Sequence, residues 1–137
     1  MESALEGITV LDLTSGIVGP YTTKLLADLG ARVIKVERPE GDPSRLMGPW
    51  FNDEQGIENS GTYQFLNTNK QSIVIDLSKK QSQIVVADLV GLADLVVTSF
   101  SPANAEKYKL TPSDIRELAD VNILSITNFG WTGPYRD

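Results

Sequence analysis

Short β-branched runs alternate with longer stretches of helical periodicity along this chain. Residues 8–13 alternate apolar and polar side chains, and residues 32–37 are rich in β-branched residues, which predicts two strands. Between them, apolar residues recur along one helical face from Pro20, a residue favoured at the first helical position, to Gly30, a typical helix stop. A strand, helix and strand joined within roughly thirty residues are expected to form a right-handed unit with parallel strands.

The alternation of strands and helices resumes after an interruption. Residues 38–60 contain proline, glycine and asparagine too densely for a regular element, so we expect a long loop that faces a ligand or an interface. Beyond it, the pattern predicts a helix at 62–66, a strand at 72–76, a helix capped by Ser78 and ended by Gly91, a strand at 94–97, helices at 102–108 and 112–118, and a strand at 123–126. This order predicts an α/β fold, a Rossmann-like, doubly wound and mostly parallel sheet of about five strands with flanking helices.

Composition limits the chemistry of the chain. Its 137 residues are enough for one domain, and they include no cysteine and no histidine. Disulfides, thiolate nucleophiles, imidazole bases and metal sites built on cysteine or histidine are therefore excluded within this chain. Carboxylates, lysines, hydroxyls and backbone amides remain as candidate reactive groups, and we expect no metal.

The charge balance points away from nucleic acid. Twelve basic residues against eighteen acidic ones give a net charge of −6, which does not suit a phosphate backbone. The acidic N-terminus does not resemble a signal peptide, and the longest apolar runs are too short to cross a bilayer. These features predict a cytoplasmic protein that binds neither nucleic acid nor membrane.

The last ten residues form a glycine- and proline-containing loop directly after the final predicted strand. In an open α/β sheet, ligands bind outside the carboxyl ends of the strands, so this loop is expected to line the site. Because nothing follows to cover that site, we expect the chain to be the N-terminal piece of a longer protein.

The turn after the first strand has two interpretations. Gly16 and Gly19 occupy two of the three glycine positions of the dinucleotide motif GxGxxG, and Glu37 lies near the position of the acid that holds a ribose. This pattern favours an NAD-binding fragment of an oxidoreductase. However, Thr14 replaces the first glycine, and Pro20 removes an N–H donor that would face a pyrophosphate. In the other interpretation, the glycines only allow the helix to pack closely on the sheet.

A resemblance to a known family adds a third line of argument. Residues 5–14, the Gly19-Pro20 pair and residues 25–37 closely resemble the opening of family III CoA-transferases, the CaiB/BaiF-like group of carnitine and formyl-CoA transferases and α-methylacyl-CoA racemases. Further matches follow in order at 41–45, 69–73, 76–77, 93–94, Phe100 with Pro102, and 129–135. The resemblance therefore extends over essentially the whole chain.

The resemblance implies a function, with CoA binding in this chain and the reacting group outside it. Residues 1–137 would be the N-terminal, Rossmann-like, coenzyme A-binding part of an enzyme that moves CoA from an acyl-CoA to a carboxylic acid. In this family an aspartate attacks the thioester, forms an anhydride and then carries CoA as an enzyme-bound thioester, and the enzymes are interlocked homodimers. That aspartate lies beyond Asp137, so no catalytic residue is expected here and the chain alone is predicted to be inactive.

The resemblance also assigns candidate CoA contacts. Arg38 matches an arginine at the adenine nucleotide end, and Lys107, beside Tyr108, falls where an arginine usually reaches the phosphates. The remaining positions are Ser15, Ile17 and Val18 at the pantetheine channel, Ile75, Ser78 where some members carry lysine, and Ser99 with Phe100 in place of an Asn-Phe pair. Because the serine and lysine replacements alter CoA-facing positions, a non-catalytic interaction domain stays open as another alternative.

Overall fold

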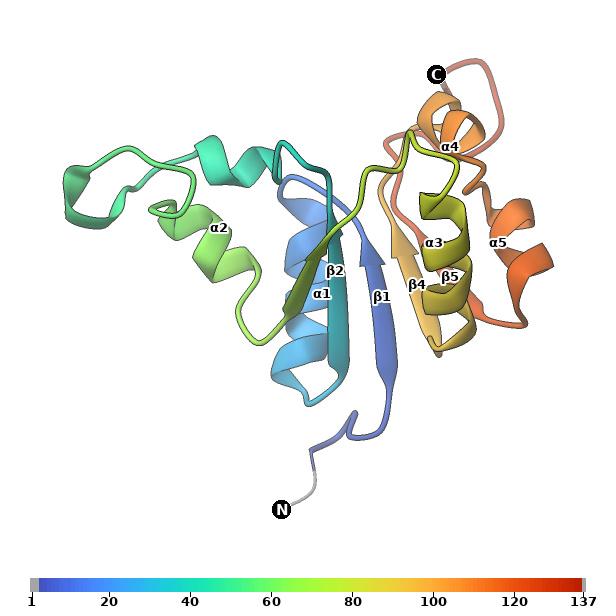
Figure 1. Cartoon of the computed structure of the whole chain (residues 1–137), viewed down its shortest axis with the longest axis horizontal. Helices are drawn as coiled ribbons and strands as arrows, with labels where there is room; N and C mark the ends of the chain where they lie inside the picture. The colour runs from blue at the N-terminus through green and yellow to red at the C-terminus, as the bar shows by residue number, and fades with distance from the viewer. Residues whose placement is uncertain (1–2, 137) are drawn as a thin grey trace.

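Five parallel strands form the sheet around which the chain folds (Figure 1). The structure is a computed structural model and describes residues 3–136. The strands are β1 (Thr9–Leu13), β2 (Arg32–Glu37), β3 (Gln71–Val74), β4 (Leu95–Thr98) and β5 (Asn122–Ser125). Their spatial order is β3-β2-β1-β4-β5, and all four neighbouring pairs are parallel. The prediction of a doubly wound, Rossmann-like sheet is confirmed.

Helices cover both faces of this sheet (Figure 1). They are α1 (Val18–Asp28), α2 (Gly61–Leu66), α3 (Ser82–Gly91), α4 (Pro102–Tyr108) and α5 (Pro112–Leu118). Helix α1 packs on one face, where Val10, Val33 and Val97 form a buried cluster with its Ala27. Helices α3 and α5 pack on the opposite face against a second buried cluster. No helix among residues 3–136 is both long and apolar enough to span a membrane.

Strand alternation separates the two clusters. Adjacent residues of β1 point to opposite faces, so Val10 joins the cluster under α1 while Leu11 joins the one under α3 and α5. By the same alternation, Asp12 follows Val10 onto the α1 face, where it is completely buried. The interior on this face is therefore partly ionic near the carboxyl ends of the strands.

Two predicted helix starts are wrong. Helix α1 begins at Val18, so Pro20 is its third residue and not its first. The helix predicted from Ser78 begins only at Ser82, because the carboxylate of Asp76 accepts hydrogen bonds from the Ser78 amide and hydroxyl at 3.0 and 2.6 Å. This local turn competes with the helix for the same backbone groups.

Two other helix boundaries follow the sequence pattern. Gly30 adopts φ 100° after α1, the left-handed conformation expected of a terminating glycine. Thr111 and Asp114 form a reciprocal capping box at the start of α5. The long loop at 38–60 is irregular as predicted, but it contains two short 3-10 helices, η1 (Pro43–Leu46) and η2 (Phe51–Asp53).

Candidate functional site

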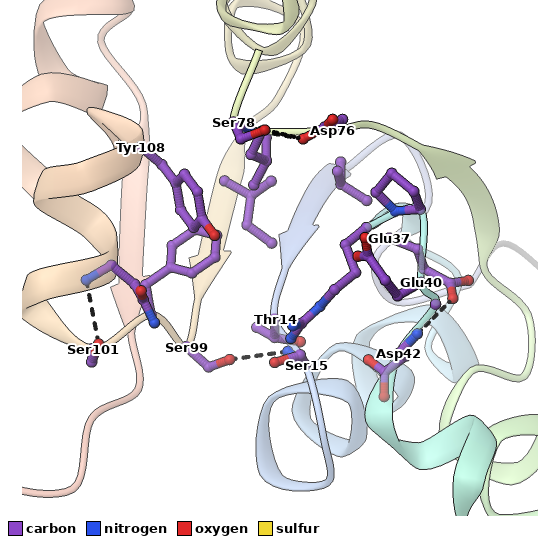
Figure 2. A pocket seen from close by; sticks show the side chains of 18 residues that line it. Thr14, Ser15, Glu37, Glu40, Asp42, Asp76, Ser78, Ser99, Ser101 and Tyr108 are labelled. Carbon is purple, nitrogen blue, oxygen red and sulfur yellow. Dashed lines mark hydrogen bonds between the residues drawn. The ribbon is translucent and has the colours of Figure 1, made fainter.

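A cavity of about 290 Å³ opens at the carboxyl ends of the strands (Figure 2). Its walls are the segments that follow β1, β2, β3 and β4, together with α4, and the chain order changes direction between the adjacent strands β1 and β4. Open α/β sheets bind ligands at such a switch point. The lining residues are Leu13, Thr14, Ser15, Val36, Glu37, Arg38, Pro39, Glu40, Gly41, Asp42, Asp76, Leu77, Ser78, Ser99, Phe100, Ser101, Asn104 and Tyr108.

Most of the CoA contacts expected from the sequence meet at this cavity. Six of the ten candidates line it, namely Ser15, Arg38, Ser78, Ser99, Phe100 and Tyr108. They come from the segments that follow β1, β2, β3 and β4 and from α4, which the parallel sheet brings together at the carboxyl ends of its strands. Figure 2 shows Ser99 and Tyr108 on the side opposite Glu37 and Glu40.

Four candidates lie outside the lining. Ile17 and Val18 are 53% and 65% exposed where α1 begins. Ile75 is buried in the core cluster under α3, because its backbone continues the β3 pairing and turns the side chain inward. The Lys107 ammonium lies 5.4 Å from the centre of the Tyr108 ring, next to the wall but not in it.

An aromatic pair forms one wall. The rings of Phe100 and Tyr108 meet edge to face, with centroids 5.7 Å apart, and both partly pack on the core beneath. Ser101 caps α4 by accepting a hydrogen bond from the Asn104 amide at 3.3 Å, which fixes the helix that carries Tyr108. This wall offers flat apolar surface to a ring or an alkyl chain.

The first turn, residues 14–16, forms the floor, and side chains occupy its backbone donors. The Thr14 amide donates to Asp12 at 2.9 Å, the Ser15 amide to the Ser99 hydroxyl at 3.0 Å, and the Gly16 amide to Asp42 at 3.3 Å. A phosphate-binding turn presents such N–H groups to its ligand. These three donors are already paired within the protein.

Gly19 explains the glycine pattern of this turn. A Cβ at Gly19 would lie 2.3 Å from the Cβ of Thr14, so α1 approaches the turn too closely for any side chain. The second interpretation of the sequence, in which glycine allows close helix packing, matches the geometry of Gly19. It does not match Gly16, which has open space around its Cβ position and adopts φ 79°, so that glycine serves the left-handed backbone of the turn.

The carboxylate of Glu37 is fully engaged. It accepts hydrogen bonds from Arg45 at 2.8 and 3.1 Å, from the Ser72 hydroxyl at 2.8 Å, from the Asp42 amide at 3.1 Å, and from the hydroxyl of Tyr63. Burial acts to raise the pKa of Glu37, but the bonds from Arg45, Tyr63 and Ser72 outweigh it and lower the pKa to about 2. Glu37 therefore anchors the loop that follows β2 and has no lone pair left for a ribose.

Two buried ion pairs support the cavity from below. Lys35 lies 2.9 Å from Asp42 and Lys70 lies 3.0 Å from Asp12, and all four side chains are at most 1% exposed. Burial lowers the pKa of Lys70, and the charge of Asp12 opposes that shift. Burial acts to raise the pKa of Asp42, but the charge of Lys35 and hydrogen bonds from Ser44 outweigh it, so the pKa lies below its ordinary value.

Sequence reasoning missed Lys35 and Lys70 as parts of this site. Lys35 occupies the same face of β2 as the buried Val33, and this parity was the signal that its ammonium points inward. Lys70 precedes β3 in a loop, and no periodicity marks it. Within residues 3–136, the guanidinium of Arg38 lines the cavity and has no hydrogen-bonded or ion-paired partner.

Comparison with known proteins gives consistent matches. The family model described as "CoA-transferase family III" matches residues 5–137. The chain is 42% identical to the succinate–glutarate CoA-transferase of Agrobacterium fabrum, over 97% of this chain and 34% of the relative. It is 40% identical to the human succinyl-CoA:glutarate CoA-transferase, over 95% of this chain and 29% of the relative. The chain thus spans about a third of the length of the curated relatives it matches.

Solved structures agree with this match. A CaiB/BaiF family protein from Brucella suis superimposes with a TM-score of 0.88 and 34% identity, over 99% of this chain and 36% of that one. A hypothetical protein (Rv3272) from Mycobacterium tuberculosis superimposes with a TM-score of 0.83 and 33% identity, over 98% of this chain and 36% of that one.

Proposed function

This chain belongs to CoA-transferase family III, and from that premise we propose that it forms the CoA-binding part of an enzyme that transfers CoA from an acyl-CoA to a carboxylic acid. The observation that supports the proposal most strongly is the convergence of six expected CoA contacts on one cavity at the switch point of the sheet. Since the relatives named above act on succinate and glutarate, short dicarboxylic acids are the first acyl groups to test.

In this proposal the cavity receives one section of an extended ligand. Its volume of about 290 Å³ is at the lower end of the usual range for small-molecule sites, roughly 300–1,000 Å³. The guanidinium of Arg38 is available to pair with a phosphate or stack on the adenine, while Phe100 and Tyr108 supply apolar contact. Lys107, Ile17 and Val18 lie where they can contact sections of CoA outside the cavity, and Ile75 supports the wall from the core.

We further propose that the reacting aspartate is not among residues 1–137, so that this chain alone does not catalyse CoA transfer. Three carboxylates of the lining, those of Glu37, Asp42 and Asp76, already accept hydrogen bonds or pair with cations. The fourth, Glu40, is exposed, and hydration makes such a carboxylate a weak nucleophile. The interlocked homodimer and the cytoplasmic location stay predictions.

The competing NAD-binding function has less support. Its two requirements were free amides in the first turn and a free acid at the end of the second strand. The Gly16 amide donates a hydrogen bond to Asp42. The carboxylate of Glu37 accepts hydrogen bonds from Arg45, Tyr63 and Ser72. No observation specifically favours a non-catalytic interaction domain.

Calorimetric titration of the chain with CoA and with NADH tests the proposal. We expect CoA to bind and NADH to give no heat beyond dilution. Arg38→Ala should weaken CoA binding about tenfold, the effect of losing about 1.4 kcal/mol from a charge-assisted contact. Arg32→Ala is the matched control, because Arg32 begins β2 at the end of the strand away from the cavity and its side chain bonds only to Gln71 among described partners. Binding of NADH, or an unchanged affinity for CoA in Arg38→Ala, would reject the proposal.

A further inference from the structure

We propose that Asp42 is a positioning residue, whose buried carboxylate ties the first turn to the loop after β2 and thereby sets how the floor of the cavity lies against the wall formed by the segment that carries Arg38. The inference rests on the proposed function, which it deepens by naming a residue on which the site's shape depends. Asp42 itself does not need to touch the ligand.

One carboxylate joins three parts of the structure. The Oδ1 atom of Asp42 accepts hydrogen bonds from the Gly16 amide at 3.3 Å and from the Ser44 amide and hydroxyl at 2.8 and 2.7 Å. Its Oδ2 atom lies 2.9 Å from the Lys35 ammonium. Asp42 therefore connects the first turn, the start of η1 and the interior of β2.

Lys35 also binds the first turn. Its ammonium donates to the Thr14 carbonyl at 3.0 Å, while its partner Asp42 accepts from the Gly16 amide. The ion pair thus holds the first turn at two backbone groups, one an acceptor and one a donor. Because both side chains are at most 1% exposed, the pair acts on a ligand only through the backbone that it holds.

The other end of this connection is the segment that carries Arg38. The Asp42 amide donates to Glu37 at 3.1 Å, and the Gly41 amide donates to the Arg38 carbonyl at 2.9 Å. Residues 38–42 are thus closed into a short loop whose last member holds the first turn. A change at Asp42 is transmitted to the Arg38 wall and to the Ser15 floor together.

The negative charge of Asp42, and not only its size, is required. An asparagine has one acceptor oxygen and one amide donor group. With the oxygen directed to Gly16 and Ser44, the amide nitrogen would face the ammonium of Lys35, a donor against a donor. Reversing the amide would pair Lys35 but present N–H groups to the Gly16 and Ser44 amides. Asp42→Asn must therefore break one side of the connection and leave a buried group without its partner.

The test combines amide hydrogen exchange with CoA affinity in the whole chain. In Asp42→Ala, which removes every acceptor at this position, we expect the Gly16 amide to exchange about tenfold faster, while the Thr14 amide, which is held by Asp12, keeps its rate. We expect the dissociation constant for CoA to rise about tenfold. Asp28→Ala is the matched control, since Asp28 pairs with Lys24 on α1 away from the cavity and should change neither measurement.

Two further variants separate positioning from general stability. Val90→Ala removes methyl groups from the core of α3 and lowers the melting temperature without touching the first turn. We expect it to leave CoA affinity unchanged. If Asp42→Ala does not fold, the double variant Lys35→Met, Asp42→Ala removes the charge that would be left unpaired and is measured in the same way.

The outcomes are distinguishable. Wild-type protein that does not bind CoA rejects the proposed function, while exchange at Gly16 still tests the structural connection. Unchanged exchange at Gly16 in the Asp42 variants overturns the positioning role. Unchanged CoA affinity in those variants, or an equal loss of affinity in Val90→Ala, overturns it as well.

Discussion

At the scale of single residues, Glu37 and Arg45 organise the loop that follows β2. Two hydrogen bonds join the guanidinium of Arg45 to Glu37, and its central carbon lies 3.6 Å from the centre of the Tyr63 ring. The same guanidinium reaches Glu58 at 3.1 Å, near the far end of the loop. Charge, planarity and stacking are thus all used at one position, and only arginine combines them.

We therefore expect Arg45→Lys to destabilise the chain even though the charge is kept. A lysine makes point contacts and cannot donate in parallel to both oxygens of Glu37, so the loss should be about 1–3 kcal/mol in the free energy of unfolding. Urea denaturation measures this loss. Arg32→Lys, on an exposed arginine with a bond to Gln71, should change stability by less than about 0.5 kcal/mol. Equal effects of the two substitutions would contradict the anchoring role.

Glu37 also predicts how stability depends on pH. Its pKa is about 2 in the folded chain against an ordinary value of 4.5, so its contribution is complete above about pH 4.5 and is lost as the pH falls toward 2. The contribution is on the order of 3 kcal/mol. Urea denaturation between pH 5 and pH 2 should show this loss in the wild type and a flatter profile in Glu37→Gln. Glu40→Gln, at an exposed position, is the control that should keep the wild-type slope.

At the scale of elements, α1 approaches the first turn so closely that Gly19 has no room for a side chain. Gly19 lies against the Thr14 side chain, whereas Gly91, the last residue of α3, has open space around its Cβ position. The two glycines are otherwise alike in being helical. Their comparison therefore isolates the effect of space.

Gly19→Ala should lower the free energy of unfolding by about 1–3 kcal/mol, because the added methyl group overlaps Thr14 and displaces α1 or the turn. Gly91→Ala should be neutral or stabilise the chain by up to about 1 kcal/mol, since alanine is the better helix former. Chemical denaturation of both variants checks the pair. A harmless Gly19→Ala would mean that the turn does not need the close approach.

Local signals explain which elements the sequence predicts well. The capping box of α5 and the glycine after α1 depend on neighbouring residues, and both lie where the pattern places them. The start of α3 does not lie where the pattern places it. The side chain of Asp76 accepts hydrogen bonds from Ser78 and forms a turn, and helix propensity alone does not predict that this turn replaces the first turn of the helix. Boundaries set by competing side-chain bonds are therefore the part of the fold that periodicity misjudges.

At the scale of the whole molecule, the sheet order determines where the site lies. The order β3-β2-β1-β4-β5 places the ends of β1 and β4 side by side, and the cavity opens there. Parallel order follows from the alternation of strands and helices, so a site at the carboxyl ends of the strands was predictable from the sequence. The expectation that the loop after the last strand lines it is not met, because no residue of 128–136 lies in the lining of the cavity. The support beneath it was predictable only in part, because parity on β2 marks Lys35, whereas the burial of Lys70 depends on Asp12, 58 residues away in the chain.

Backbone amide NMR during a CoA titration locates the ligand on the protein, and we expect CoA in the cavity at the carboxyl ends of the strands. A second cavity, of about 200 Å³ between α3 and α5, serves as an internal comparison, with Gln83 and Glu117 in its lining. We predict that the amide signals that shift cluster at Ser15, Arg38 and Ser99. Shifts that cluster instead at Gln83 and Glu117, or an absence of shifts at saturating CoA, would mean that CoA does not bind in this cavity.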